Sequence, residues 1–249
     1  MTTRIALVGA TGRMGGLIAR LIAESDDFEL TVGLSSADPL DKIVGVDIVV
    51  DVTTPQASPS VVEYAIAHGH NVLVGTSGWS ADRVAGLEAK ISGNLDVGVL
   101  IVPNFSLGSV LSTIFAGIAG RFYDSVEIVE SHHAAKVDSP SGTAVRTAEH
   151  IAAQREGHEP LTPPHAEQTA RGQVVGGVPI HSLRMRGVVA QQDIVFGGHG
   201  EQLVLRHETL SPTAYEAGIL RALRALGDIR GVVVGLDKLI DLRSNDGLR

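Results

Sequence analysis

Ionisable and turn-forming residues are concentrated in the middle of the chain, at residues 130–144 (ESHHAAKVDSPSGTA). His132 and His133 are adjacent, and histidine is the side chain whose proton affinity lies closest to neutrality, so it is the natural general acid or base. Lys136 adds a fixed positive charge. These residue types at this spacing predict a proton donor beside a cation.

Ser141, Gly142 and Thr143 follow as a turn that leads into an expected helix. A helix N-terminus presents unpaired backbone N–H groups and a partial positive charge, which suit a carboxylate or phosphate. Taken alone, a His-His pair is usually solvated and a Ser-Gly-Thr turn is often only a cap. With Lys136 between them, the two pieces favour an anion site with a proton donor. Asp138 either orients one of these cations or is a surface acid.

A glycine-rich turn at residues 9–15 (GATGRMG) joins the first expected strand to the first expected helix. Glycines at such a turn allow a sharp bend, close approach of a pyrophosphate and tight helix–strand packing. The spacing is GxxGxxG rather than GxGxxG, but its position after the first strand favours a dinucleotide site over a turn without a ligand. Arg13 either reaches a phosphate or is a solvated surface side chain.

Small polar residues follow three later strands, at 51–55, 75–79 and 103–105. Ligands of open α/β sheets bind outside the carboxyl ends of the strands, so these segments are expected to complete a crevice. At the end of the second strand, Ser35 stands where an Asp or Glu usually binds the ribose, and Asp38 comes slightly later. A missing carboxylate suits NADPH and Asp38 suits NADH, so both cofactors remain open.

The elements that must position these residues alternate along the first 105 residues. Short apolar runs predict buried parallel strands, and apolar residues at helical spacing predict the helices between them. We expect strands at 5–8, 28–34, 46–52, 72–74 and 97–102, and helices at 14–25, 61–68 and 80–91. This alternation predicts a Rossmann-like, doubly wound parallel sheet in an α/β protein.

The pattern changes after residue 105 and predicts a second α+β domain with a mixed, largely antiparallel sheet, because glycine turns join its later strands. We expect strands at 125–130, 178–185, 188–196 and 202–208, helices at 107–122 and 143–155, and an exposed loop at 156–171. A last helix at 212–226 is expected to pack back on the first domain. The predicted domains are therefore residues 1–105 with 212–249, which bind the dinucleotide, and residues 106–211.

Composition limits the class of protein. The chain has 249 residues, 44% hydrophobic and 19% charged, which is typical of a globular protein. A net charge of -8 argues against nucleic acid as a partner. The absence of cysteine excludes disulfides, Cys-based zinc sites and a thiol nucleophile. No apolar run approaches the roughly 18 residues of a membrane helix, and no signal peptide is recognisable, so we expect a soluble cytoplasmic protein.

Both motifs together make the chain resemble the dihydrodipicolinate reductase (4-hydroxy-tetrahydrodipicolinate reductase) family of lysine and diaminopimelate biosynthesis. The resemblance covers nearly the whole chain and rests on GATGRMG, GTSGW, PNFS, ESHHAAKVDSPSGTA and FGGHGEQLVLRHE. It implies reduction of a cyclic, unsaturated imine dicarboxylate to tetrahydrodipicolinate by NADH or NADPH, without a metal. It also implies a homotetramer assembled through the sheets of the second domain, at 106–211, which would bind substrate.

The resemblance also implies roles for individual residues. His132 and Lys136 would be the proton donors, and His133, Ser141, Gly142 and Thr143 would hold the substrate. Cofactor contacts would come from Gly9, Ala10, Thr11, Gly12, Arg13, Met14, Ser35, Gly75, Thr76, Ser77, Val102, Pro103, Asn104 and Phe105. Ser77 and Trp79 depart from the GTTGF of many members, and Thr11 and Ser35 leave the NADH or NADPH preference open.

Two other classes of function compete with this hypothesis. A dinucleotide-binding sensor or scaffold would keep the first domain without chemistry, but it has no use for the proton donors of the HHxxK pattern. A two-domain dehydrogenase acting on an amino-acid semialdehyde would be favoured if dicarboxylates neither bound nor competed.

Overall fold

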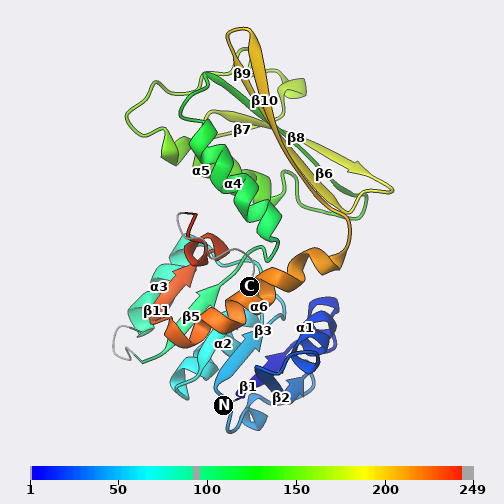
Figure 1. The fold of residues 1–249 in the computed structure, drawn as a ribbon, viewed down its shortest axis with the longest axis vertical. Coiled ribbons are helices and arrows are strands. Elements are labelled where there is room, and N and C mark those ends of the chain that lie inside the picture. The colour runs from blue at the N-terminus through cyan, green and yellow to red at the C-terminus, as the bar shows by residue number, and fades with distance from the viewer. Residues whose placement is uncertain (1, 92–95, 243–249) are drawn as a thin grey trace. The chain divides into compact units, whose positions relative to one another are not determined.

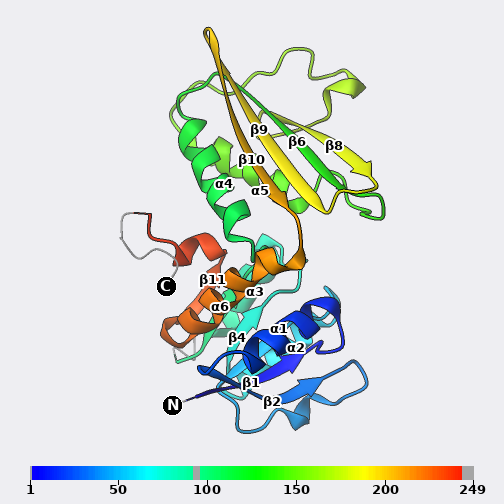
Figure 2. The same ribbon diagram turned by 45° about the vertical axis from the view of Figure 1, so that its right-hand side comes forward.

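The computed structural model describes residues 2–91 and 96–242 and has two compact units. One unit contains the residues up to Leu107 together with those from Tyr215 onward, and the other spans Gly108–Ala214. Figure 1 and Figure 2 show the elements of each unit from two directions. The expected boundaries, 105/106 and 211/212, lie close to these, and the functions assigned to the two parts stay a prediction.

The first unit contains a six-stranded sheet in the order β11-β5-β4-β3-β1-β2, and all its strand pairs are parallel. The strands are β1 (Thr3–Val8), β2 (Phe28–Leu34), β3 (Ile48–Asp51), β4 (Asn71–Val74), β5 (Gly98–Ile101) and β11 (Gly231–Val234). The doubly wound parallel sheet is thus confirmed. The strand β11 was not expected, because its four residues become a strand only by pairing with β5, far away in sequence.

Helices cover both faces of this sheet, which explains why its central strands are apolar over most of their length. The helices are α1 (Arg13–Ala23), α2 (Ser58–Ala67), α3 (Ala81–Ile91) and α6 (Glu216–Ala225). Side chains of α2 and α3 pack with Val49, Val72 and Val99 in one core. Helices α1 and α6 contact each other. The helix expected at 212–226 divides into a 3-10 turn, Pro212–Tyr215, and α6.

The second unit contains a five-stranded sheet in the order β10-β9-β6-β8-β7. Its strands are β6 (Ser125–His133), β7 (Gln173–Val175), β8 (Val178–Met185), β9 (Ala190–Gly198) and β10 (Glu201–Thr209). Only the pairing of β6 with β8 is parallel, so the mixed, largely antiparallel sheet is confirmed. Strand β6 extends beyond the expected residue 130 and includes both adjacent histidines, because β8 and β9 pair with it on either side.

Helices α4 (Leu107–Ala119) and α5 (Gly142–Gln154) pack against one face of this second sheet. Ile128, Ile194 and Phe196 point from neighbouring strands into this core, where Ala148 and Ile151 of α5 meet them. Because side chains alternate along a strand, the intervening residues lie on the open face of the sheet. That face carries both ion pairs and exposed apolar side chains.

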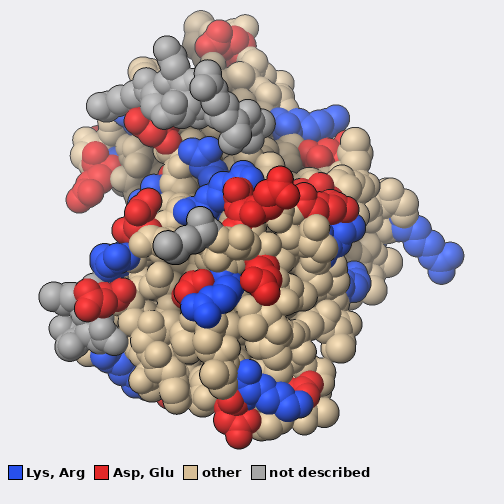
Figure 3. Space-filling model, turned by 60° about the horizontal axis from the view of Figure 1, so that its bottom comes forward, with Lys and Arg blue, Asp and Glu red and all other residues tan. Residues whose placement is uncertain are grey.

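Many charged side chains on the face drawn in Figure 3 lie next to charges of the opposite sign. Arg4 pairs with Asp47, Arg20 with both Glu24 and Glu216, and Arg224 with Asp27. Among the described residues, no helix is both long and apolar enough to cross a lipid bilayer.

Candidate active site

The C-terminal half of β6 carries the ionisable residues. Val126 and Ile128 are buried in the core, and the next residues on the same face are Glu130 and His132. The Glu130 side chain is fully buried, and that of His132 is 15% exposed. The apolar face of the strand therefore becomes polar toward its end, and a histidine lies at the edge of the core.

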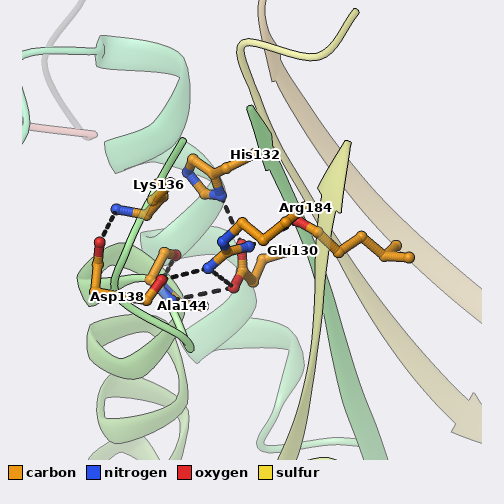
Figure 4. Close-up of polar contacts among 8 residues, drawn as sticks. Glu130, His132, Lys136, Asp138, Ala144 and Arg184 are labelled. Carbon is orange, nitrogen blue, oxygen red and sulfur yellow. Dashed lines mark hydrogen bonds and ion pairs between the residues drawn. The ribbon is translucent and has the colours of Figure 1, made fainter. Parts of the chain in front are cut away.

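Three residues, His132, Arg184 and Ser141, make four contacts with the carboxylate of Glu130 (Figure 4). Its Oε2 atom lies 2.6 Å from Nδ1 of His132. The two terminal nitrogens of Arg184, on β8, each donate to one carboxylate oxygen at 2.9 Å. The backbone N–H of Ser141 donates to Oε1 at 3.2 Å. Burial raises the pKa of Glu130, but hydrogen bonds from Arg184, Ser182 and His132 together bring it below its usual value.

His132 is held in a defined orientation by its contact with Glu130. Burial lowers the pKa of His132, the carboxylate of Glu130 raises it, and the charges of Lys136 and Arg184 lower it, with a net decrease from the usual value. The ring is therefore neutral near pH 7 in the protein without a ligand. Nδ1 is the ring nitrogen that faces the carboxylate of Glu130, and Nε2 lies on the opposite side of the ring.

Lys136 lies in the loop between β6 and α5, where its backbone N–H donates to the carbonyl of His133 at 3.0 Å. Its Nζ atom lies 2.7 Å from Oδ1 of Asp138, which is half exposed. Arg184 also donates to the backbone carbonyl of Asp138, so it holds this loop as well as Glu130. Asp138 is therefore both paired with a cation and half exposed at the surface.

Helix α5 begins where the sequence places the Ser-Gly-Thr turn. Ser141 is the N-cap, and its Oγ accepts a hydrogen bond from the backbone N–H of Ala144 at 3.2 Å. The side chain of Ser141 thus caps α5, and such a cap stabilises a helix N-terminus. Gly142 and Thr143 form the first turn, so their backbone N–H groups lie at the positive end of the helix dipole.

His133 is on the other side of the sheet from His132, because consecutive side chains of a strand point to opposite faces. It pairs in register with Met185 at the end of β8, whose side chain is exposed. The structure therefore gathers His132, Lys136 and the first turn of α5 in one place and leaves His133 on the open face at the strand end.

Glu130 and Arg184 were not among the predicted site residues. Glu130 could have been found as the one acidic residue on the apolar face of the expected strand at 125–130, which also carries Val126 and Ile128. Its contact with His132 could not, because that strand was expected to end at residue 130. Arg184 could not, because its position opposite His132 depends on the parallel register of β6 and β8.

The glycine turn of the first unit has the geometry of a close-packed strand–helix junction. A Cβ atom on Gly15 would lie 2.2 Å from the carbonyl oxygen of Gly9, and one on Gly9 would lie 2.5 Å from that of Val52. Gly9 also has a φ of +91°, which favours glycine. Gly12 is the N-cap of α1 and contributes no side-chain cap, so the first turn of α1 presents backbone N–H groups alone.

The strand ends predicted to form a crevice lie next to one another in the first unit. The backbone N–H of Thr53, after β3, donates to Oγ1 of Thr76, after β4, at 2.8 Å. A Cβ atom on Gly75 would lie 2.8 Å from the ring of Phe105, after β5. Asn104 accepts a hydrogen bond from the backbone of Ser106. The sheet thus brings together the ends of β3, β4 and β5, as predicted from the sequence.

Asp38 reaches back to the end of β2. Its Oδ2 atom accepts hydrogen bonds from the backbone N–H and the Oγ of Ser35, at 2.9 and 2.7 Å, and Lys42 Nζ lies 2.6 Å from Oδ1. The hydrogen bond from Lys42, followed by those from Ser35, lowers the pKa of Asp38. An ionised carboxylate therefore lies beside Ser35 although residue 35 itself is not acidic.

Comparison with known proteins identifies the family of this chain. The profile described as "Dihydrodipicolinate reductase, N-terminus" matches residues 3–105, and "Dihydrodipicolinate reductase, C-terminus" matches residues 107–240. The chain belongs to the dihydrodipicolinate reductase family. Its membership confirms the resemblance inferred from the motifs, and it makes the protein an oxidoreductase of a family that acts in lysine and diaminopimelate biosynthesis.

Individual members of the dihydrodipicolinate reductase family resemble the chain over most of its length. The 4-hydroxy-tetrahydrodipicolinate reductase of Clavibacter sepedonicus is 61% identical over 249 residues, covering 100% of this chain and 89% of the relative. That of Streptomyces griseus is 41% identical, covering 96% of this chain and 98% of the relative. The dipicolinate-bound dihydrodipicolinate reductase of Paenisporosarcina sp. TG-14 superposes with a TM-score of 0.79 at 29% identity, covering 96% and 100%.

Proposed function

We propose that this protein reduces 4-hydroxy-tetrahydrodipicolinate (dihydrodipicolinate) to tetrahydrodipicolinate, with His132 and Lys136 as proton donors. The observation that carries the proposal is that His132 and the N-cap of α5 both contact the buried carboxylate of Glu130, with the charge of Lys136 near His132. Similarity to full-length reductases of that name supports the choice of substrate.

A planar dicarboxylate fits the charges of this site. The ammonium of Lys136 would hold one carboxylate, and the backbone N–H groups of Gly142 and Thr143 would donate hydrogen bonds to the other at the positive end of α5. Ser141 would contribute as the cap that fixes this end of the helix. The solved relative from Paenisporosarcina is described as bound to dipicolinate, which is such a dicarboxylate.

His132 would supply the proton through Nε2. 4-Hydroxy-tetrahydrodipicolinate would first lose one water to give the conjugated imine, dihydrodipicolinate. Each turnover then adds one hydride and one proton to that imine, and hydride addition leaves an electron-rich enamine that must be protonated. The lowered pKa leaves His132 neutral in the free protein. Two substrate carboxylates nearby would raise that pKa, so the imidazolium would form where it is needed.

The first unit would bind the nicotinamide dinucleotide, which supplies the hydride when bound. The backbone N–H groups at the start of α1, in the turn made by Gly9, Ala10, Thr11, Gly12, Arg13 and Met14, suit a pyrophosphate. Glycines 9 and 15 fit this role, because a Cβ atom on either would overlap the backbone. The strand ends at Gly75, Thr76, Ser77 and at 102–105 would line the rest of the crevice.

The preference between NADH and NADPH would depend on the end of β2. The ionised carboxylate of Asp38 beside Ser35 would repel the 2′-phosphate of NADPH, and Lys42 beside it would offset part of that charge. Rates with both cofactors therefore have to be measured.

The chain would assemble as a homotetramer through the open face of the second sheet. Leu183, Met185 and Val204 on that face are each nearly half exposed, which is unusual for large apolar side chains on one sheet face. Light scattering after gel filtration would test this, and a Leu183→Glu variant should then run as a smaller species.

The reaction is tested by loss of nicotinamide absorbance after mixing the protein, freshly made dihydrodipicolinate synthase product and NADH or NADPH. Oxidation that pyridine-2,6-dicarboxylate inhibits is the expected result, and His132→Gln should lower kcat by about 100-fold or more. His199→Gln, at an exposed turn, is the matched control. Dinucleotide binding without oxidation would favour a sensor, and failure of dicarboxylates to compete would favour a semialdehyde substrate.

A further inference from the structure

Glu130 is a buried charged group for which substrate and cofactor binding give no reason. Its carboxylate continues the face of β6 that holds Val126 and Ile128 in the core, and it is fully buried. Removing a carboxylate from water costs several kcal/mol unless partners compensate, of the order of the whole stability of many domains. An apolar residue at this position would avoid that cost, so the reason for the carboxylate is sought in its contacts.

The contact with His132 selects one protonation pattern of the imidazole. Nδ1 lies 2.6 Å from Oε2 of Glu130, so the proton between them is carried by Nδ1 and donated to the carboxylate. A second proton can then bind only at Nε2, on the opposite side of the ring from Glu130. A carboxylate fixed against one ring nitrogen thus decides which nitrogen exchanges the catalytic proton.

Arg184 keeps that carboxylate ionised and in place. Its guanidinium forms a two-point contact with both oxygens, 2.9 Å each, and it also donates to the carbonyl of Asp138 in the loop of Lys136. The charged groups that act on His132 are Glu130, Lys136 and Arg184. Asp138 is paired with Lys136, and the charge of Arg184 also lowers the pKa of Asp138. Of these charged groups, only Glu130 touches the imidazole through a hydrogen bond to Nδ1.

We propose that Glu130 is a positioning residue, whose carboxylate, clamped by Arg184, holds His132 as the Nδ1–H tautomer and makes Nε2 its proton-donating atom. This inference rests on the proposed function of His132 and deepens it. Glu130 also accepts a hydrogen bond from the backbone N–H of Ser141, so the same carboxylate contacts both His132 and the N-terminus of α5. Strand β6, strand β8 and helix α5 are thereby held together at one point.

The first test compares Glu130→Gln with Glu127→Gln. Glu127 is a matched control, because it lies on the same strand, on the opposite face, and also binds an arginine and a histidine, Arg171 and His181. Glu130→Gln should lower kcat by about 10- to 100-fold, a part of what a general acid contributes. It should also move the alkaline limb of the kcat/KM profile to lower pH, because the charge that raises the affinity of His132 for a proton is lost. Glu127→Gln should change neither kcat nor the alkaline limb of the kcat/KM profile.

The second test needs no variant at position 130. Nitrogen chemical shifts of the His132 ring, assigned by the signals lost in His132→Gln, should show Nδ1 protonated and Nε2 unprotonated in the neutral wild-type protein. A neutral ring protonated at Nε2 would overturn the proposal, even if Glu130→Gln failed to fold. So would a folded Glu130→Gln with unchanged kcat and pH profile.

The two levels of the hypothesis fail in different ways. If the wild-type protein oxidises neither NADH nor NADPH, the proposed reaction is wrong, whereas the ring nitrogens still report the tautomer. If the protein is active and His132→Gln is not, an unprotonated Nδ1 would reject the role of Glu130 alone.

Discussion

The Nζ atom of Lys136 lies 2.7 Å from Oδ1 of Asp138, two residues later in the same loop. The cation that the sequence predicts for substrate binding is therefore already paired in the protein without a ligand. Burial raises the pKa of Asp138, but the hydrogen bond from Lys136 brings it below its usual value, so Asp138 is ionised at neutral pH. A dicarboxylate must compete with Asp138 for this ammonium.

Removing that competitor should strengthen binding of a dicarboxylate. Asp138→Asn should lower the dissociation constant of pyridine-2,6-dicarboxylate by about twofold to fivefold, since a half-exposed ion pair contributes less than about 1 kcal/mol. Titration calorimetry in low salt measures it, and the gain should shrink as ionic strength rises. Glu63→Gln, which breaks the exposed pair with Lys90, should change nothing. Weaker binding by Asp138→Asn would show that Asp138 orients Lys136 more than it competes.

Arg184→Met should destabilise the protein because it leaves Glu130 as a buried carboxylate without its main partner. The expected cost is about 3 kcal/mol, measured by urea unfolding. Arg206→Met breaks the more exposed pair with Asp193 and should cost less than about 1 kcal/mol. Equal losses of unfolding free energy in the two variants would mean that burial of the Glu130–Arg184 pair does not increase its contribution to stability.

Stability should also depend on pH through Glu130. Its pKa is below the usual value in the folded protein, so its contribution is complete above the pKa of the unfolded chain and is lost as pH falls through the folded pKa. Arg184→Met removes the strongest group that lowers this pKa. The variant should therefore show a smaller loss of unfolding free energy on acidification than the wild-type protein over this range, measured by urea unfolding at a series of pH values.

The pH profile of turnover should separate the free protein from its complex with substrate. The pKa of His132 is lowered in the free protein, mainly by burial, so the alkaline limb of kcat/KM should fall below the usual histidine range. Substrate carboxylates would raise that pKa, so the corresponding limb of kcat should lie at higher pH. Steady-state kinetics across the pH range measure both, and coincident limbs would argue against His132 as the donor.

Asp38→Ser should shift cofactor preference toward NADPH. The change removes an ionised carboxylate beside Ser35 and leaves Lys42 free of its partner at the end of β2. The ratio of kcat/KM for NADPH to that for NADH should rise by about tenfold, equivalent to roughly 1.4 kcal/mol. Asp47→Ser, in an ion pair with Arg4, is a control. An unchanged ratio of the two kcat/KM values would mean that residues other than Asp38 discriminate between NADH and NADPH.

Gly15→Ala and Gly16→Ala should behave oppositely although the two glycines are adjacent in α1. A Cβ atom at position 15 would lie 2.2 Å from the carbonyl oxygen of Gly9, whereas one at position 16 would have no atom within 4 Å. Gly15→Ala should abolish tight dinucleotide binding, measured by fluorescence titration. Gly16→Ala should bind normally and gain up to about 1 kcal/mol of stability from helix propensity. A loss of binding in both would point to flexibility of the turn instead.

Local patterns in the sequence were sufficient for several features of this protein. The alternation of apolar runs and helical spacing in the first 105 residues determines the parallel sheet, because strands buried on both faces must be apolar throughout. The turn at 9–15 and the cap at Ser141 are likewise set by residues close together in the chain, so they could be recognised without any tertiary contact.

Strand pairing decided what the sequence left open. Residues 231–234 form strand β11 because they pair with β5. Strand β6 extends through His133 because β8 and β9 pair with it. The parallel register of β6 and β8 sets Arg184 opposite His132 and gives the buried carboxylate of Glu130 its counter-ion. The sequence by itself therefore determined the candidates for the chemistry, His132 and Lys136. Only the tertiary structure decided which of them touch, because contacts between distant strands depend on register, which no local pattern encodes.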